Sequence, residues 1–215
     1  LFVFMVTSSG TCKKTSLSNF SRPRKGGIIA IELRGDDRLV GVEITSGEHE
    51  ILLFSSAGKS IRFRESDVRS VGRTAIGVRG IRLADGDKVV SLIVAEATDP
   101  ILTATEKGYG KRTNLDEYRT QARGGSGVIS IKTSKRNGKV VGAIQVTDED
   151  EMMLISNKGT LVRARSNDVS IIGRNTQGVT LINIAEDEEL VSVAKIAESD
   201  EESDDNSDTD NILEE

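Results

Sequence analysis

The sequence predicts an all-β, propeller-like fold built from four similar blades. A unit of about fifty residues occurs four times along the chain. Within each unit, short runs of Ile, Val and Leu alternate with polar residues and are separated by turn clusters, whereas helical spacing is brief, as at 114–118. Fifty residues in four strands is about the size of a propeller blade. WD-type and kelch-type blades rely on tryptophan, and this chain has none, which favours another blade chemistry.

Each unit begins with a predicted hairpin. An apolar run and three turn residues are followed by a glycine and then by a strand that carries a base, as in ILLFSSAGKSIRF from Ile51. A glycine after such a loop suits a hairpin whose last turn residue needs a positive φ. The hairpin glycines are Gly10, Gly58, Gly108 and Gly159.

The second half of each unit supplies two further predicted strands. The third follows a second repeated glycine, as in GIIAIEL, GVRGIRL, GVISIKT and GVTLINI, and the fourth reads LVGVEI, VVSLIV, VVGAIQV and LVSVAKI. These repeat glycines are Gly27, Gly77, Gly127 and Gly178. The predicted blades span about 1–49, 50–99, 100–150 and 151–197.

Charge divides the chain into a basic body and an acidic tail. All 29 Lys and Arg precede residue 198, whereas ten of the 34 Asp and Glu lie in 198–215. The tail is predicted to be disordered, because a segment so charged cannot bury enough apolar surface to offset its ordering entropy. It acts either as a solubiliser or as a polyanion that competes for the basic body.

The second strand of each unit carries a base at the same position. Because side chains alternate between the two faces of a strand, these bases are predicted to form a curved stripe on one face. A stripe on four blades favours a polyanionic ligand, although a solvated outer face that discourages edge pairing also explains one blade. The aligned bases are Lys14, Arg62, Arg112 and Arg163, and their basic neighbours are Lys13, Arg64, Lys111 and Arg165.

A glycine-bearing loop with an arginine precedes the third strand. In the third unit it reads QARGGSG, in which Gln121, Arg123, Gly124, Gly125 and Gly127 are the residues of interest. Glycine lets backbone N–H groups approach a phosphate closely, so these loops are predicted to contact the phosphate groups of a polyanion. The loop bases elsewhere are Arg24 and Lys25 in the first unit, Arg73 in the second and Arg174 in the fourth.

These repeats, together with GVRGIRLADGDKVVSLIV, GYGKRT, ISNKGTLVRARSNDVSIIGRNTQGV and the acidic tail, resemble the C-terminal domain family of the DNA gyrase A subunit. The resemblance covers essentially the whole chain and implies a β-pinwheel, a propeller-like ring of six blades with exchanged hairpin strands. The chain resembles the last four blades and the tail. The family's Q-R-R-G-G-K-G box belongs to the first blade, and QARGGSG resembles a degenerate copy with Ala122 and Ser126 in place of two bases.

The resemblance implies a module that wraps double-stranded DNA, so that a bacterial type II topoisomerase introduces negative supercoils. It implies two partners, the rest of the gyrase A subunit together with the gyrase B subunit, and implies ATP and Mg²⁺ for the holoenzyme. The alternatives are the corresponding domain of topoisomerase IV and a Gly-rich, propeller-like protein-interaction scaffold.

No catalytic residue, cofactor or metal is expected within this chain. There is no P-loop, and the carboxylates lie in turns without the spacing of a metal site. His49, the only histidine, is predicted to be a surface residue, and Cys12 a buried strand residue. A single cysteine rules out an internal disulfide, and the sequence has no run of 18 apolar residues that would predict a membrane span, so a cytoplasmic protein is expected. The resemblance implies that it is bacterial and associated with the nucleoid.

Overall fold

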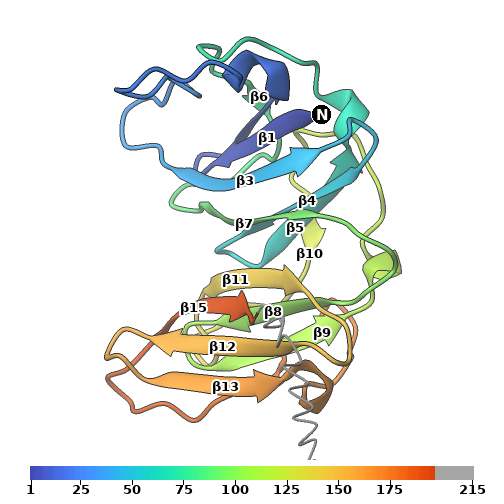
Figure 1. Ribbon diagram of the computed structural model, residues 1–215. Coiled ribbons are helices and arrows are strands. Elements are labelled where there is room, and N and C mark those ends of the chain that lie inside the picture. The colour runs from blue at the N-terminus through green and yellow to red at the C-terminus, as the bar shows by residue number, and fades with distance from the viewer. Residues whose placement is uncertain (197–215) are drawn as a thin grey trace, which may run out of the picture.

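The computed structural model describes residues 1–196 as an all-β structure with four small antiparallel sheets in a propeller arrangement (Figure 1). The predicted acidic tail, 198–215, lies outside the described residues. Four short 3-10 turns interrupt the strands: η1 (Leu17–Phe20), η2 (Glu65–Asp67), η3 (Leu115–Glu117) and η4 (Ser166–Asp168). None of the helices among the described residues is long and apolar enough to span a membrane.

Each sheet takes three strands from one repeat. The first contains β1 (Phe2–Thr7), β2 (Thr11–Ser16) and β3 (Leu39–Thr45), and the second β4 (Glu50–Ser55), β5 (Lys59–Arg64) and β7 (Val89–Val94). The third contains β8 (Ile101–Thr105), β9 (Tyr109–Thr113) and β11 (Val140–Gln145), and the fourth β12 (Glu151–Ser156), β13 (Leu161–Arg165) and β15 (Leu190–Lys195).

The outermost strand of the first three sheets comes from the following repeat. β6 (Val78–Arg79) pairs with β2, β10 (Val128–Ile129) with β5, and β14 (Val179–Thr180) with β9. Figure 1 shows β6 with the first sheet and β10 with the second, although each belongs in sequence to the following repeat. This is the strand exchange that the family resemblance implies, and it links every repeat to the next. The fourth sheet has three strands among the described residues.

The repeat glycines are explained by this exchange. Gly10 has φ +84°, and a Cβ there would lie 2.8 Å from the carbonyl oxygen of Ile81 in the exchanged segment. At Gly77, with φ +108°, an added Cβ would meet the backbone of Cys12. A side chain at either glycine would therefore be strained in conformation and would push the exchanged strand away.

The core runs through the stacked sheets as three apolar clusters. The first joins Phe4 and Val6 of β1 to Ile51 and Leu53 of β4, and these four side chains are fully buried. The other two clusters join the second sheet to the third and the third to the fourth. Other sheets cover both faces of the inner sheets. Consecutive residues of their strands, which point to opposite faces, are therefore both buried.

Candidate nucleic-acid interface

The aligned second-strand bases hold adjacent blades together. Lys14 Nζ donates to the carbonyl oxygen of Glu65 at 3.3 Å, at the start of the next repeat's 3-10 turn. Arg62 donates to the carbonyl oxygens of Leu115 (2.9 Å) and Tyr118 (3.1 Å).

The same arrangement recurs at the third junction. Arg112 Nε donates to the carbonyl oxygen of Val169 at 2.8 Å, and its guanidinium also pairs with Asp148. Each base therefore donates to carbonyl groups within or directly after a 3-10 turn of the next repeat.

The predicted exposed stripe is wrong for four of its members. Lys13 and Lys111 are fully buried, and Lys14 and Arg112 are 6% and 5% exposed. The strand alternation was correct, but the face assigned to solvent is covered by the adjacent blade. A base whose donors are bound to carbonyls within such a junction is not accessible to a phosphate.

The two buried lysines bind carbonyls in or close to the glycine-bearing loops. Lys13 Nζ donates to the carbonyl oxygens of Ala30 (2.8 Å), Ala75 (3.0 Å) and Arg73. Lys111 Nζ donates to those of Gly173 and Arg174, both at 2.6 Å, and burial lowers its pKa to about 8.

The last repeat shows the same residue without a junction. Arg163 has a side chain that is 64% exposed and pairs with Glu151 of its own sheet. Its neighbour Arg165 is exposed, as is Arg64 in the second repeat. Arg163 and Arg62 therefore share a repeat position and an acidic partner, and differ in whether another blade lies against them.

The loop arginines also reach back to the preceding repeat. Arg123 donates to the carbonyl oxygens of Asp67 (2.9 Å) and Arg79 (3.0 Å). Arg73 and Arg174 donate, each at 2.7 Å, to the carbonyl oxygens of Ile29 and Ile129, which occupy the repeat position of Arg79. These loops thus fix the exchanged strand, while Arg24 and Lys25 in the first repeat remain exposed.

The rest of the QARGGSG loop is also bound to the preceding blade. The backbone N–H of Gln121 donates to the Arg62 carbonyl at 2.9 Å, and the Gly125 carbonyl accepts from Arg82 N–H at 2.8 Å. Gly124 and Gly127 have φ values of +80° and +69°, and a Cβ on Gly127 would overlap the backbone of Ser60. Positive φ at both glycines, and close packing at Gly127, explain them without a ligand.

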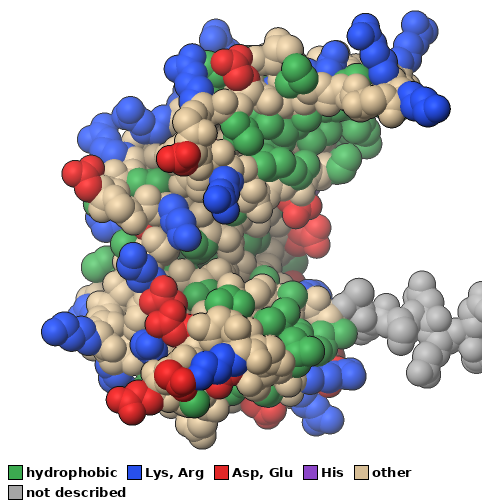
Figure 2. Space-filling view, turned by 90° about the vertical axis from the view of Figure 1, so that its left-hand side faces the viewer, with side chains coloured by type: hydrophobic (Ala, Val, Ile, Leu, Met, Phe, Trp, Pro, Cys, Tyr) green, Lys and Arg blue, Asp and Glu red, His purple; other side chains and the backbone are tan. Residues whose placement is uncertain are grey.

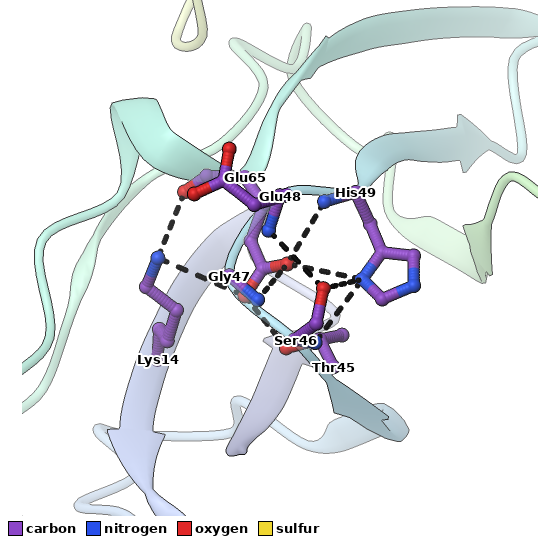
Figure 3. A network of polar contacts seen from close by, with 7 residues as sticks. All are labelled: Lys14, Thr45, Ser46, Gly47, Glu48, His49 and Glu65. Atoms are coloured by element: carbon purple, nitrogen blue, oxygen red, sulfur yellow. Dashed lines mark hydrogen bonds and ion pairs between the residues drawn. The ribbon is translucent and has the colours of Figure 1, made fainter.

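A buried carboxylate organises the first junction (Figure 3). Glu65, which is fully buried, accepts hydrogen bonds from Thr45 Oγ1 at 2.6 Å and from the N–H of Gly47 at 3.0 Å. Its carboxylate also lies 3.7 Å from Lys14 Nζ and 3.4 Å from His49 Nδ1. His49 therefore belongs to a structural network that the sequence did not indicate.

The exposed bases include two aligned pairs that the predicted stripe overlooked. Arg69 and Arg119 follow η2 and η3, while Arg82 and Lys132 follow the exchanged strands β6 and β10. Each pair is exposed and is separated by fifty residues, a spacing that would have revealed them in the sequence. Within residues 1–196, no ion pair involves these four side chains.

Exposed bases line an edge that runs along the whole molecule. Figure 2 shows Lys and Arg side chains from top to bottom along the left-hand edge of the view, with acids among them. The outermost strands of the sheets are β6, β10 and β14, so bases on or beside these strands face away from the propeller axis. This surface can meet a long polyanion across several blades.

Neither sulfur nor carboxylate groups form a reactive centre in the described part of the chain. Cys12 is buried, and burial raises the pKa of its thiol to about 12, which keeps it protonated at neutral pH. Within residues 1–196, no three His, Cys, Asp or Glu side chains are grouped so as to hold a metal ion.

Comparison with known families matches every repeat. The model for the "DNA gyrase C-terminal domain, beta-propeller" family matches residues 2–46, 49–96, 99–147 and 150–197.

Relatives with high identity include the DNA gyrase A subunit of Salmonella typhimurium, 59% identical over 91% of this chain and 22% of that protein. The DNA gyrase A subunit of Escherichia coli is 56% identical over 94% of this chain and 23% of that protein. The chain thus spans less than a quarter of the length of these relatives.

Two solved structures share the fold. A DNA gyrase A C-terminal domain superimposes with a TM-score of 0.82 and 30% identity, covering 91% of this chain and 66% of that one. The C-terminal domain of a DNA topoisomerase IV gives a TM-score of 0.86 and 29% identity, covering 91% and 61%.

Proposed function

Because the chain belongs to the DNA gyrase C-terminal domain family, we propose that it binds duplex DNA and bends it around the outer edge of its blades. The observation that carries this proposal is the set of exposed bases beside the outermost strands, and Figure 2 shows Lys and Arg side chains along one whole edge of the molecule. Phosphate contacts supply affinity without sequence information, so such an edge suits wrapping of arbitrary sequences.

The contacts are assigned to exposed bases. Arg69, Arg82, Arg119 and Lys132 recur on adjacent blades. The exposed members of the predicted set join them: Arg24, Lys25, Arg64, Arg163 and Arg165. The buried bases act indirectly, because they fix the angle between blades and so the curvature of the edge.

Bending is driven by the sum of these contacts. Smoothly bending a site of 20–30 base pairs by 40–90° costs on the order of 1–6 kcal/mol, which each further phosphate contact offsets. Within a longer gyrase A subunit, together with gyrase B, ATP and Mg²⁺, this wrap would set the crossing that the enzyme converts into negative supercoils.

The structural match to topoisomerase IV makes its corresponding domain the second candidate. The identities of 59% and 56% to gyrase A subunits favour the gyrase assignment. Relaxing closed circular DNA with the chain bound separates wrapping from mere binding, because only wrapping shifts the linking number. DNA binding without any shift would contradict the wrapping proposal.

The salt dependence of binding tests the assigned residues. Replacing Arg69, Arg82, Arg119 and Lys132 with Gln should reduce the slope of log K against log salt by roughly 3–4, at about 0.9 per lost phosphate contact. Lys195→Gln is the matched control, because this exposed base lies on the innermost strand β15. An unchanged slope in the fourfold variant, or a loss of about 0.9 in the single-residue control, would contradict the assignment.

A further inference from the structure

We infer that the loop 134–139, called here the third-repeat loop, binds a second segment of duplex DNA that crosses the array of blades. The inference rests on the proposed binding of a first duplex along the outer edge and adds a separate contact to it. The third-repeat loop differs in charge from its counterparts in the other repeats.

Each repeat has a loop that leads into the innermost strand of its sheet. The loops 34–38, 84–88 and 185–189 contain two to four acids each. The third-repeat loop leads into β11 and contains no acid and three bases, Lys135, Arg136 and Lys139, all of which are exposed. Of the four repeats, only the third therefore has a purely basic loop at this place.

The carboxylate that ties this loop to its blade comes from the opposite side in the third repeat. In the second repeat, Asp87 of the loop accepts a hydrogen bond from Ser56 Oγ of the hairpin turn at 2.8 Å, and Asp37 accepts a similar bond in the first. In the third repeat, Glu106 of the hairpin turn accepts from the backbone N–H of Lys139 at 2.8 Å. The attachment is thus kept while the loop itself carries only bases.

The third-repeat loop is held in a fixed conformation. Asn137 is fully buried, and its side chain accepts from the N–H of Ser134 at 2.8 Å and donates to the carbonyl oxygen of Lys132 at 2.8 Å. The guanidinium of Arg136 lies 4.8 Å from the centre of the Tyr109 ring, within the range of a cation–π interaction. Fixed bases lose less conformational entropy when a ligand binds.

The bases of the third-repeat loop are available to a ligand. Among residues 1–196, no ion pair involves Lys135, Arg136 or Lys139. In the adjacent fourth-repeat loop, the carboxylate of Glu189 pairs instead with Lys107 at 3.0 Å. Exposed cations without a carboxylate partner suit the phosphate groups of a duplex.

The direction of the loop separates this contact from the outer edge. The loop leads from β10, the outermost strand of the second sheet, to β11, the innermost strand of the third, so its bases lie across the array rather than along it. The loops on either side, 84–88 and 185–189, carry more acids than bases, which disfavours a path along this face.

The face concerned is the one that carries the hairpin turns, because the N–H of Lys107 donates to the carbonyl oxygen of Asn137 at 3.1 Å. Figure 1 has the turn between β12 and β13 on its left-hand side, and Figure 2 looks at that side. Lys and Arg side chains there reach from the left-hand edge towards the middle of the view. A duplex on this face would cross the one on the outer edge.

The test uses the 215-residue chain and two duplexes of one sequence, one attached to beads and the other free and fluorescent. The wild-type chain should retain the fluorescent duplex on the beads, because the outer edge holds one duplex and the third-repeat loop the other. Lys135→Gln combined with Arg136→Gln should reduce this capture roughly tenfold and lower its salt slope by about 1.8, for two lost phosphate contacts.

Two controls make the result specific. Affinity of the loop variant for a single duplex should change less than about twofold, because the outer edge supplies most phosphate contacts. Arg34→Gln combined with Arg38→Gln alters two exposed bases of the first-repeat counterpart, where Asp36 and Asp37 accompany them, and should leave the capture unchanged.

Three results would overturn the inference: a wild-type chain that captures no second duplex, a loop variant that captures as much as wild type, or a control that loses as much as the loop variant. A loop variant whose affinity for a single duplex falls as far as its capture would also overturn it, since the loop would then belong to the outer-edge path. Replacing the four outer-edge bases tests the proposed function separately. If that variant bound a single duplex as tightly as wild type, the outer-edge assignment would fail, whatever the loop variant showed.

Discussion

Arg112 and Arg163 stand at the same position of successive repeats, yet they have opposite surroundings. Arg112 is 5% exposed and bonded to the next blade, whereas the Arg163 side chain is 64% exposed and bonded within its own sheet. The strand sequences around the two arginines, YGKRT and LVRAR, do not reveal this difference in surroundings. A base that recurs in every repeat therefore marks the junction between blades, and its exposure depends on whether a following blade is present.

Removing the carboxylate of the first junction should have the largest effect. Glu65→Ala leaves Lys14 and Thr45 without their buried partner, and breaking a buried ion pair costs about 3–5 kcal/mol. Urea unfolding should show this loss in the free energy of unfolding. Glu48→Ala, in the exposed part of the same turn, is the control and should change it by less than about 0.5 kcal/mol.

The next largest effect is expected from alanine substitutions at Gly127, which packs against Ser60, and at Gly27, which has open space around it. Alanine at Gly27 or Gly127 costs about 1–2 kcal/mol, because both have positive φ. At Gly127 the added Cβ also overlaps the backbone of Ser60, which adds about 1–3 kcal/mol of overpacking. Thermal unfolding of the two variants measures the difference. Equal losses would show that the contact at Gly127 is unimportant.

The comparison between the two arginines is tested directly by matched substitutions. Arg112→Met should cost about 1–3 kcal/mol, because the Val169 carbonyl loses its donor inside the junction. Arg163→Met should change the free energy of unfolding by less than about 0.5 kcal/mol, since its ion pair with Glu151 is exposed to water. Similar losses in both variants would contradict the assigned role of the junction.

A pH series tests the buried base Lys111. Burial lowers the pKa of Lys111 from 10.5 to about 8, so between these values the unfolded chain binds more protons than the folded one at this site. The Lys111 contribution to stability must therefore rise as pH increases from about 8 to 10.5. The difference in unfolding free energy between wild type and Lys111→Met should increase over this range. A flat difference would mean that Lys111 titrates normally.

Much of the fold was predictable because repeated residues impose repeated structure. The fifty-residue period, the short alternating strands and the hairpin glycines predicted an all-β array of four blades, and the sheets confirm it. The role of the bases was not predictable from alternation. Alternation separates the two faces of β9 but does not reveal that a second blade covers the face of Arg112.

The exposed bases were hidden for a related reason. Arg69 and Arg119, like Arg82 and Lys132, recur in two repeats, whereas the junction bases recur in all four. Strict recurrence therefore directed attention to the residues that hold the blades together. The exposed bases recur in only two repeats and so gave a weaker signal.

The exchange of outer strands sets an order for folding during synthesis. Because β2 pairs with β6, the first sheet stays incomplete until about sixty further residues have been made. At 5–20 residues per second this wait lasts roughly 3–12 s, and the second and third sheets are delayed in the same way. Throughout translation, a nascent chain of this protein therefore carries an incomplete blade at its growing end, and a chaperone that covers strand edges would find its substrate there.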